Sequence, residues 1–90
     1  MIVEKDVVLK NKYGLHARPA TLFAETANRF ESEIAIVKDG QDVNGKSIMG
    51  VLMLAAAQGT SVHVRAEGEN AELAVAAIAA LFDKGFDESM

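Results

Sequence analysis

The single proline of this 90-residue chain, Pro19, limits where the first helix can begin. Proline has no backbone N–H, and a helix tolerates it only in the first turn, where N–H groups have no helical acceptor. Around it apolar residues recur at steps of three and four, which is typical of a helix with one buried face. The pattern predicts a helix that begins at Ala17 and ends near Arg29 or Phe30. Its apolar face would consist of Ala20, Phe23, Ala27 and Phe30.

The segment that leads into this helix, residues 14–20, reads Gly-Leu-His-Ala-Arg-Pro-Ala. The first N–H groups of a helix lack partners and its dipole is positive there, so a helix start attracts anions. His16 would lie beside these groups, where a neutral imidazole can accept a phosphoryl group. Arg18 is unfavourable in a first turn unless an anion binds, and its guanidinium suits phosphate oxygens. The simpler alternatives are an ordinary N-cap histidine and a solvated arginine.

The composition argues against several classes of protein. The chain has no cysteine and two histidines far apart in sequence, so a disulfide framework is excluded and a metal site has little support. Its charged first 20 residues do not resemble a signal peptide, and its longest apolar run, residues 51–57, is too short to span a bilayer. The net charge of −4 argues against nucleic acid as a partner. We therefore expect one cytoplasmic domain over residues 1–90, with no cofactor and no membrane partner.

Runs of apolar residues between turn signals predict four strands, at residues 3–9, 33–38, 41–43 and 61–66. Asp39-Gly40 is a tight-turn signal between the second and third strands. The last strand alternates clearly, which would place His63 and Arg65 on the side opposite Val62, Val64 and Ala66. We assign His63 to the solvent face, with no function.

Two further helices are predicted. Ser47 is a good N-cap residue in front of an apolar segment at residues 48–54. Asn70 would cap a last helix that Gly85 stops, and the acidic tail after it would fray. The apolar stripe of that helix would consist of Leu73, Ala74, Ala77, Ile78, Leu81 and Phe82. The order β-α-β-β-α-β-α predicts a two-layer α+β protein, in which three helices cover one face of a four-stranded sheet.

Two motifs at this spacing resemble the HPr family, the histidine-containing phosphocarriers of the bacterial phosphoenolpyruvate-dependent phosphotransferase system (PTS). The first is residues 14–20, and the second is Asn-Gly-Lys-Ser-Ile-Met-Gly-Val-Leu-Met-Leu at residues 44–54. The resemblance covers essentially the whole chain and implies the family fold, an open-faced β-sandwich with an antiparallel sheet. The Asn-Gly-Lys-Ser sequence at residues 44–47, with glycine at position 45, resembles that of proteobacterial members. Many of those members act in nitrogen or carbon regulation rather than in sugar uptake.

The resemblance also implies a function and its residues. Enzyme I would phosphorylate His16 at Nδ1, using phosphoenolpyruvate, and His16 would pass the phosphoryl group to a IIA-type acceptor. The chain would then be a phosphoryl carrier and not an enzyme, with Arg18 and the backbone N–H of Ala17 stabilising the phosphate. Ser47 would be a regulatory phosphosite for the ATP-dependent HPr kinase/phosphorylase in hosts that have it, in addition to capping its helix. Family members usually act as monomers.

A partner surface is expected beside His16. If Val51 and Leu54 fill the core, then Ile48, Met49 and Leu52 face partly outward, and exposed apolar groups of this kind suit docking. We also count Ala20, Thr21 and Lys46 in this surface. The alternatives are ordinary core packing for the apolar residues and a solvated side chain for Lys46.

Three functions therefore compete at the level of sequence. The first is a phosphoryl carrier, and the second is a regulatory binding module of a nitrogen- or carbon-control PTS branch that acts through its phosphorylation state. The third is a small ligand-binding domain, which would need a concave apolar pocket with polar groups, and the sequence offers no such cluster.

Overall fold

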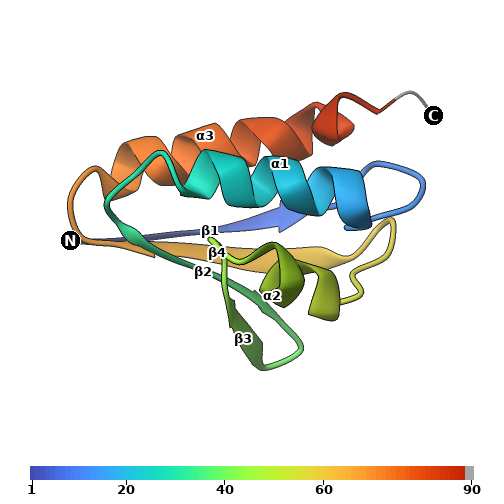
Figure 1. The fold of residues 1–90 in the computed structure, drawn as a ribbon, viewed down its shortest axis with the longest axis horizontal. Helices are drawn as coiled ribbons and strands as arrows, with labels where there is room; N and C mark the ends of the chain where they lie inside the picture. Colours follow the sequence, from blue (N-terminus) through green and yellow to red (C-terminus); the bar gives the residue numbers. More distant parts are fainter. Residues whose placement is uncertain (89–90) are drawn as a thin grey trace.

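The structure is a computed structural model that describes residues 1–88. Its elements are β1 (Ile2–Val8), α1 (Ala17–Ala27), β2 (Glu33–Lys38), β3 (Gln41–Asn44), α2 (Ile48–Met53), β4 (Ser61–Glu67), α3 (Ala71–Asp83) and a 3₁₀ turn, η1 (Gly85–Asp87). The strands form one antiparallel sheet in the order β1-β4-β2-β3. Figure 1 shows α1 and α3 side by side over one face of the sheet. The short helix α2 also contacts α1. The predicted fold class is confirmed, and η1 is an addition to it.

The two faces of the sheet differ as the alternation in β4 predicts. Val62, Val64 and Ala66 are buried under the helices. On the other face the His63 ring lies between two carboxylates of β1, with Nε2 2.7 Å from Glu4 Oε1 and Nδ1 2.8 Å from Asp6 Oδ1. These two hydrogen bonds raise the pKa of His63 above its ordinary value. The contacts account for His63 as part of a polar outer face.

The C-terminal end of α1 differs from the prediction. The helix ends at Ala27, not at Arg29 or Phe30. The Asn28 side chain donates a hydrogen bond to the carbonyl of Ala24 at 2.8 Å, and the next two N–H groups bond three residues back instead of four. A side chain that competes for helical carbonyls and a tightening last turn both end an α-helix.

The predicted details of α3 are wrong in two places. Leu73, assigned to the buried stripe, is 62% exposed. The buried face consists of Ala71, Ala74, Val75, Ile78, Ala79 and Phe82. Asn70 precedes the helix in a left-handed conformation, with φ at 64°, and its side chain makes no capping hydrogen bond. A capping side chain normally requires an extended backbone at that residue, which explains the lost bond.

The core between the two layers is centred on three aromatic rings. Phe23 of α1 meets Phe82 of α3 edge-on, with ring centroids 6.1 Å apart, and Phe82 meets Phe86 of η1 at 4.9 Å. All three side chains are fully buried.

No helix found within residues 1–88 combines the length and apolar character needed to cross a membrane.

Candidate functional site

His16 occupies the N-cap position of α1, as the position of Pro19 predicts. Its backbone is extended, with φ at −82° and ψ at −168°, and its side chain makes no hydrogen bond to the helix. The side chain is 40% exposed. The imidazole therefore stands at the start of a helix without being used as a cap, which leaves its chemistry available.

A close contact between two loops holds His16 in place. Gly14, in the left-handed region with φ at 65°, packs so tightly against the segment after α2 that a Cβ there would lie 2.1 Å from the carbonyl oxygen of Ala56. The next residue, Leu15, is buried and donates its N–H to the same oxygen at 2.9 Å. Both the backbone conformation and the close approach require glycine. The start of α1 is thereby attached to the C-terminal side of α2.

The first turn of α1 is open to an anion. The first N–H to bond within the helix is that of Ala20, to the carbonyl of His16 at 3.0 Å. The N–H groups of Ala17 and Arg18 thus have no helical acceptor, and Pro19 has no N–H to offer. The guanidinium of Arg18 is exposed, and no hydrogen bond or ion pair to residues 1–88 restrains it. Thr21 Oγ1 donates to the carbonyl of Ala17 at 2.8 Å, within the helix.

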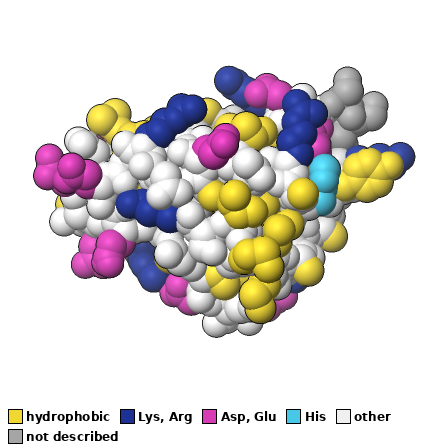
Figure 2. All heavy atoms as spheres, viewed as in Figure 1, with side chains coloured by type: hydrophobic (Ala, Val, Ile, Leu, Met, Phe, Trp, Pro, Cys, Tyr) yellow, Lys and Arg dark blue, Asp and Glu magenta, His cyan; other side chains and the backbone are white. Residues whose placement is uncertain are grey.

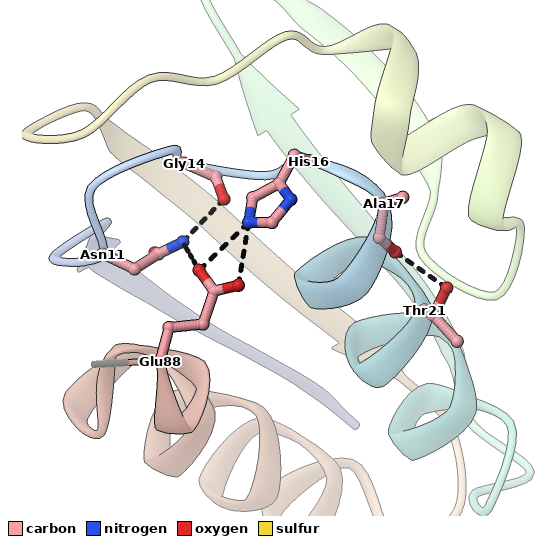
Figure 3. Close-up of polar contacts among 6 residues, drawn as sticks. All are labelled: Asn11, Gly14, His16, Ala17, Thr21 and Glu88. Atoms are coloured by element: carbon pink, nitrogen blue, oxygen red, sulfur yellow. Dashed lines mark hydrogen bonds and ion pairs between the residues drawn. The ribbon is translucent and has the colours of Figure 1, made fainter. Parts of the chain in front are cut away.

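The structure brings Glu88 close to His16. Glu88 is not among the site residues predicted from the sequence. Figure 3 shows its carboxylate between the imidazole and the Asn11 amide. His16 Nε2 lies 2.8 Å from Oε2 and 3.0 Å from Oε1, and Asn11 Nδ2 donates to Oε1 at 2.8 Å. The hydrogen bond from His16 is the main cause that lowers the pKa of Glu88. Burial opposes it with the next largest effect, and the hydrogen bond from Asn11 and the charges of His16 and Arg18 lower the pKa further. Of the acidic tail that is expected to fray, residues 86–88 form and follow the turn η1, and residues 89 and 90 lie outside the described residues. Phe86, a large apolar residue just after the predicted helix stop at Gly85, is the sequence signal that this segment packs onto the core.

Ser47 caps α2, as predicted. Its Oγ accepts a hydrogen bond from the N–H of Gly50 at 3.0 Å. The neighbouring Lys46 is not a free solvated side chain, because its Nζ donates to the carbonyl of Phe30 at 2.7 Å and its own carbonyl accepts from Asn28 Nδ2 at 3.0 Å. These contacts place Ser47 beside the C-terminal end of α1. His16 is at the other end of that 11-residue helix, which spans about 16 Å.

An exposed apolar surface covers the outer side of α2. Val51 and Leu54 are buried, as predicted, while Ile48 is 42% and Met49 66% exposed. Leu52 is half-buried, and Met53, which is not among the residues predicted for the partner surface, is 68% exposed. We call Ile48, Met49, Leu52 and Met53 the α2 patch. Figure 2 shows hydrophobic side chains gathered over the position of α2.

One residue assigned to the partner surface does not belong there. Ala20 has no exposed surface, because it lies on the inner face of α1 against the core. The position of a small residue in a first turn does not reveal which face it occupies until the helix is packed.

No other feature of residues 1–88 competes with this arrangement as a small-molecule or metal site. A shallow hollow over β2 and β3 is lined largely by charged side chains, including Glu33, Asp42, Arg65 and Glu67, and not by the apolar wall that a ligand pocket needs. Within residues 1–88, no group of three or more histidines and carboxylates is placed to hold a metal ion.

Known proteins are similar to this chain in sequence and in fold. The family described as PTS HPr component phosphorylation site matches residues 3–84. The phosphocarrier protein HPr of Xylella fastidiosa is 41% identical over 87 residues, 97% of this chain and 98% of that protein. The crystal structure of HPr-C-His from Thermoanaerobacter tengcongensis superposes with a TM-score of 0.94 at 45% identity, over 98% and 99% of the two chains. Crh from Bacillus subtilis, a catabolite repression protein described as a dimer with a swapping domain, has a TM-score of 0.75 at 44% identity, over 92% and 95%. This chain therefore belongs to the HPr family of PTS phosphocarriers.

Proposed function

We propose that this protein carries a phosphoryl group on Nδ1 of His16, accepting it from phospho-enzyme I and passing it to a IIA-type acceptor in the cytoplasm. One observation carries the proposal. His16 stands at the open N-terminus of α1 with its side chain unused as a cap, and the exposed guanidinium of Arg18 lies in the same turn. Family membership supports the phosphocarrier role in general, and this geometry supports His16 as the acceptor.

The chemistry of the transfer suits these groups. Phosphoryl transfer passes through a loose transition state, in which positioning and charge compensation matter more than strong nucleophilicity. Nδ1 supplies the lone pair. The backbone N–H of Ala17, which has no helical acceptor, and the planar guanidinium of Arg18 compensate the charge on the phosphoryl oxygens. The phosphoryl group on His16 needs no pocket in this protein, because the donor or acceptor protein supplies the rest of the reaction site.

The α2 patch is the proposed docking surface. A carrier presents one atom to a donor and to an acceptor, so it needs a surface that fits more than one partner. Methionine is flexible and polarisable and suits such surfaces, and two of the four residues in the patch are exposed methionines. We place Thr21 at the edge of this surface, with enzyme I and IIA-type domains as the partners. We propose that the protein acts as a monomer, which leaves the α2 patch accessible to both partners. A related chain, Crh, forms a dimer with a swapping domain.

The intact mass of the protein after incubation with enzyme I and phosphoenolpyruvate tests the proposal. We expect the mass of one phosphoryl group to be added and then lost after mild acid, because a P–N bond is acid-labile. Omitting enzyme I is the control. No added mass with an enzyme I that phosphorylates another HPr would overturn the proposal.

A second function, regulation through Ser47, is favoured by its position. The Ser47 hydroxyl caps a helix that carries the docking surface, and a phosphate at a helix N-terminus is tolerated electrostatically. The kinase would be the bifunctional HPr kinase/phosphorylase. A chain regulated in this way could also control other proteins through its phosphorylation state, as expected of a nitrogen- or carbon-control PTS branch.

Ser47→Asp is expected to lower kcat/KM for phosphorylation by enzyme I by about tenfold. The charge would act on docking, because Ser47 and His16 are at opposite ends of α1, a helix about 16 Å long, and salt screens exposed charges beyond about 8 Å. Steady-state kinetics measures the effect. Ser47→Asn is the matched control, because asparagine caps equally well and adds no charge. The rate at which phosphohistidine hydrolyses without a partner should be the same in both variants. Equal kcat/KM values for the two variants would contradict regulation through Ser47.

A further inference from the structure

The contact between Glu88 and His16 determines which ring nitrogen holds a proton. A carboxylate only accepts hydrogen bonds, so a ring nitrogen 2.8 Å from it carries the hydrogen. A glutamate carboxyl is ordinarily ionised at neutral pH, and the contacts of Glu88 lower its pKa further. Nε2 is therefore the protonated nitrogen, and in the neutral ring the lone pair is on Nδ1. Figure 3 shows Nδ1 on the opposite side of the ring, toward Ala17 at the start of α1.

The protein holds Glu88 in this position. Gly85, Phe86 and Asp87 all lie in the left-handed region, with φ between 56° and 59°, so the chain turns back after α3. The buried ring of Phe86 anchors this turn, and the N–H of Glu88 donates to the carbonyl of Gly85 at 3.1 Å. The Glu88 side chain is only 14% exposed. A non-glycine residue with positive φ is costly, so burial of Phe86 maintains a strained turn next to the site.

Asn11 provides a second restraint on the carboxylate. Its side chain is fully buried, and its Nδ2 donates both to Glu88 Oε1 at 2.8 Å and to the carbonyl of Gly14 at 2.7 Å. Its Oδ1 is buried without a partner among residues 1–88. A buried acceptor without a partner is unfavourable. The two hydrogen bonds that Nδ2 donates offset this cost and hold the Asn11 amide in its orientation. Asn11 thus links the carboxylate to the glycine that positions His16.

We infer that Glu88 is a positioning residue for His16: its carboxylate keeps the ring proton on Nε2 and directs the Nδ1 lone pair toward the phosphoryl group. The consequence for transfer rests on the proposed function. As Nδ1 attacks, the N–P bond forms, the bond from phosphorus to the donor breaks, and its electron pair leaves with the donor. The ring now carries the phosphoryl group on Nδ1, a hydrogen on Nε2 and a positive charge, which Glu88 neutralises. Onward transfer returns the electron pair to Nδ1, and no proton moves on the ring in either direction.

The tautomer of His16 tests this inference without any partner protein. Long-range ¹H–¹⁵N NMR at a pH where the ring is neutral measures the proton on each nitrogen. We expect the wild-type ring to be almost entirely the Nε2–H form. In Glu88→Gln and Glu88→Ala the Nδ1–H form should increase at least about threefold, because the acceptor-only partner is gone. His63, on the outer face of the sheet, is the internal reference and should not change. The same tautomer ratio in all three proteins would overturn the inference.

Phosphorylation kinetics then tests the role in transfer. In both Glu88 variants the rate of phosphoryl acceptance from enzyme I should fall by about tenfold, less than for the buried aspartate of a hydrolytic triad. Asp87→Asn is the matched control. It removes an exposed carboxylate from the neighbouring residue, and asparagine tolerates the left-handed backbone found there. An unchanged or faster rate in the Glu88 variants, despite a shifted tautomer, would overturn the positioning role. Failure of the wild-type protein to take up phosphate would count against the proposed function alone, because the NMR result is independent of it.

Discussion

Replacing His16 by alanine is expected to abolish acid-labile phosphorylation, with a loss of at least about a thousandfold in rate. The reason is that the reacting atom is removed, and the next three residues, Ala17, Arg18 and Pro19, have no nucleophilic side chain. Intact mass after incubation with enzyme I and phosphoenolpyruvate measures the loss. The fold should be retained, because the side chain makes no capping hydrogen bond and is 40% exposed. We expect the thermal unfolding midpoint to move by less than about 5 °C.

His63→Ala is the matched control, because His63 is the other histidine of the chain. It lies on the outer face of the sheet between Glu4 and Asp6, away from the helices. This variant should take up acid-labile phosphate at the wild-type rate. Retained acid-labile phosphate in His16→Ala, with loss in His63→Ala, would show that the acceptor has been assigned to the wrong residue.

The second large effect is expected from Met49→Asp in the α2 patch. A carboxylate at the centre of a docking surface loses its water on binding without gaining a partner, which costs about 3 kcal/mol, or roughly a hundredfold in affinity. We therefore expect kcat/KM for enzyme I to fall about a hundredfold. The hydrolysis rate of phosphohistidine at His16 should stay unchanged, because the substitution removes no group from the reacting atom. Steady-state transfer assays with enzyme I and acid quenching measure both quantities.

Leu73→Asp separates docking from a general effect of charge. Leu73 of α3 is 62% exposed and Met49 66% exposed, so the two substitutions place the same new charge at equally exposed apolar positions on helices. Leu73 is not part of the α2 patch, and Leu73→Asp should reduce kcat/KM by less than about twofold. An equal reduction in both variants would refute the α2 patch as the docking surface.

Much of the site could be predicted because its signals are local. Pro19 restricts the helix start to the residues just before it, and His16 is the N-cap as a direct consequence. Ser47 caps α2 through a bond to a residue three positions on. The alternation in β4 specifies which side chains face the helices. In each case neighbouring residues decide the structure, so the prediction needs no knowledge of the rest of the fold.

The face of α3 shows why other features could not be predicted. Most residues of this helix, which reads AELAVAAIAALFD, are apolar, so the periodicity is weak and predicts the wrong face for Leu73. Packing against β1, β4 and α1 selects Val75 and Ala79 for the core instead. An apolar helix with little amphipathic contrast can be rotated without breaking its own pattern, and only its neighbours decide the rotation.

The sequence by itself determined the order of the elements, the fold class, the place of His16 and Arg18 at a helix start and the cap at Ser47. Only the tertiary structure decided that Ala20 is buried, that Met53 joins the exposed surface of α2 and that Glu88 contacts His16 across 72 positions of sequence. The physical reason is the range of the interactions. Capping, turns and strand alternation act between near neighbours, whereas the contact of Glu88 depends on Phe86 entering a core built by distant elements.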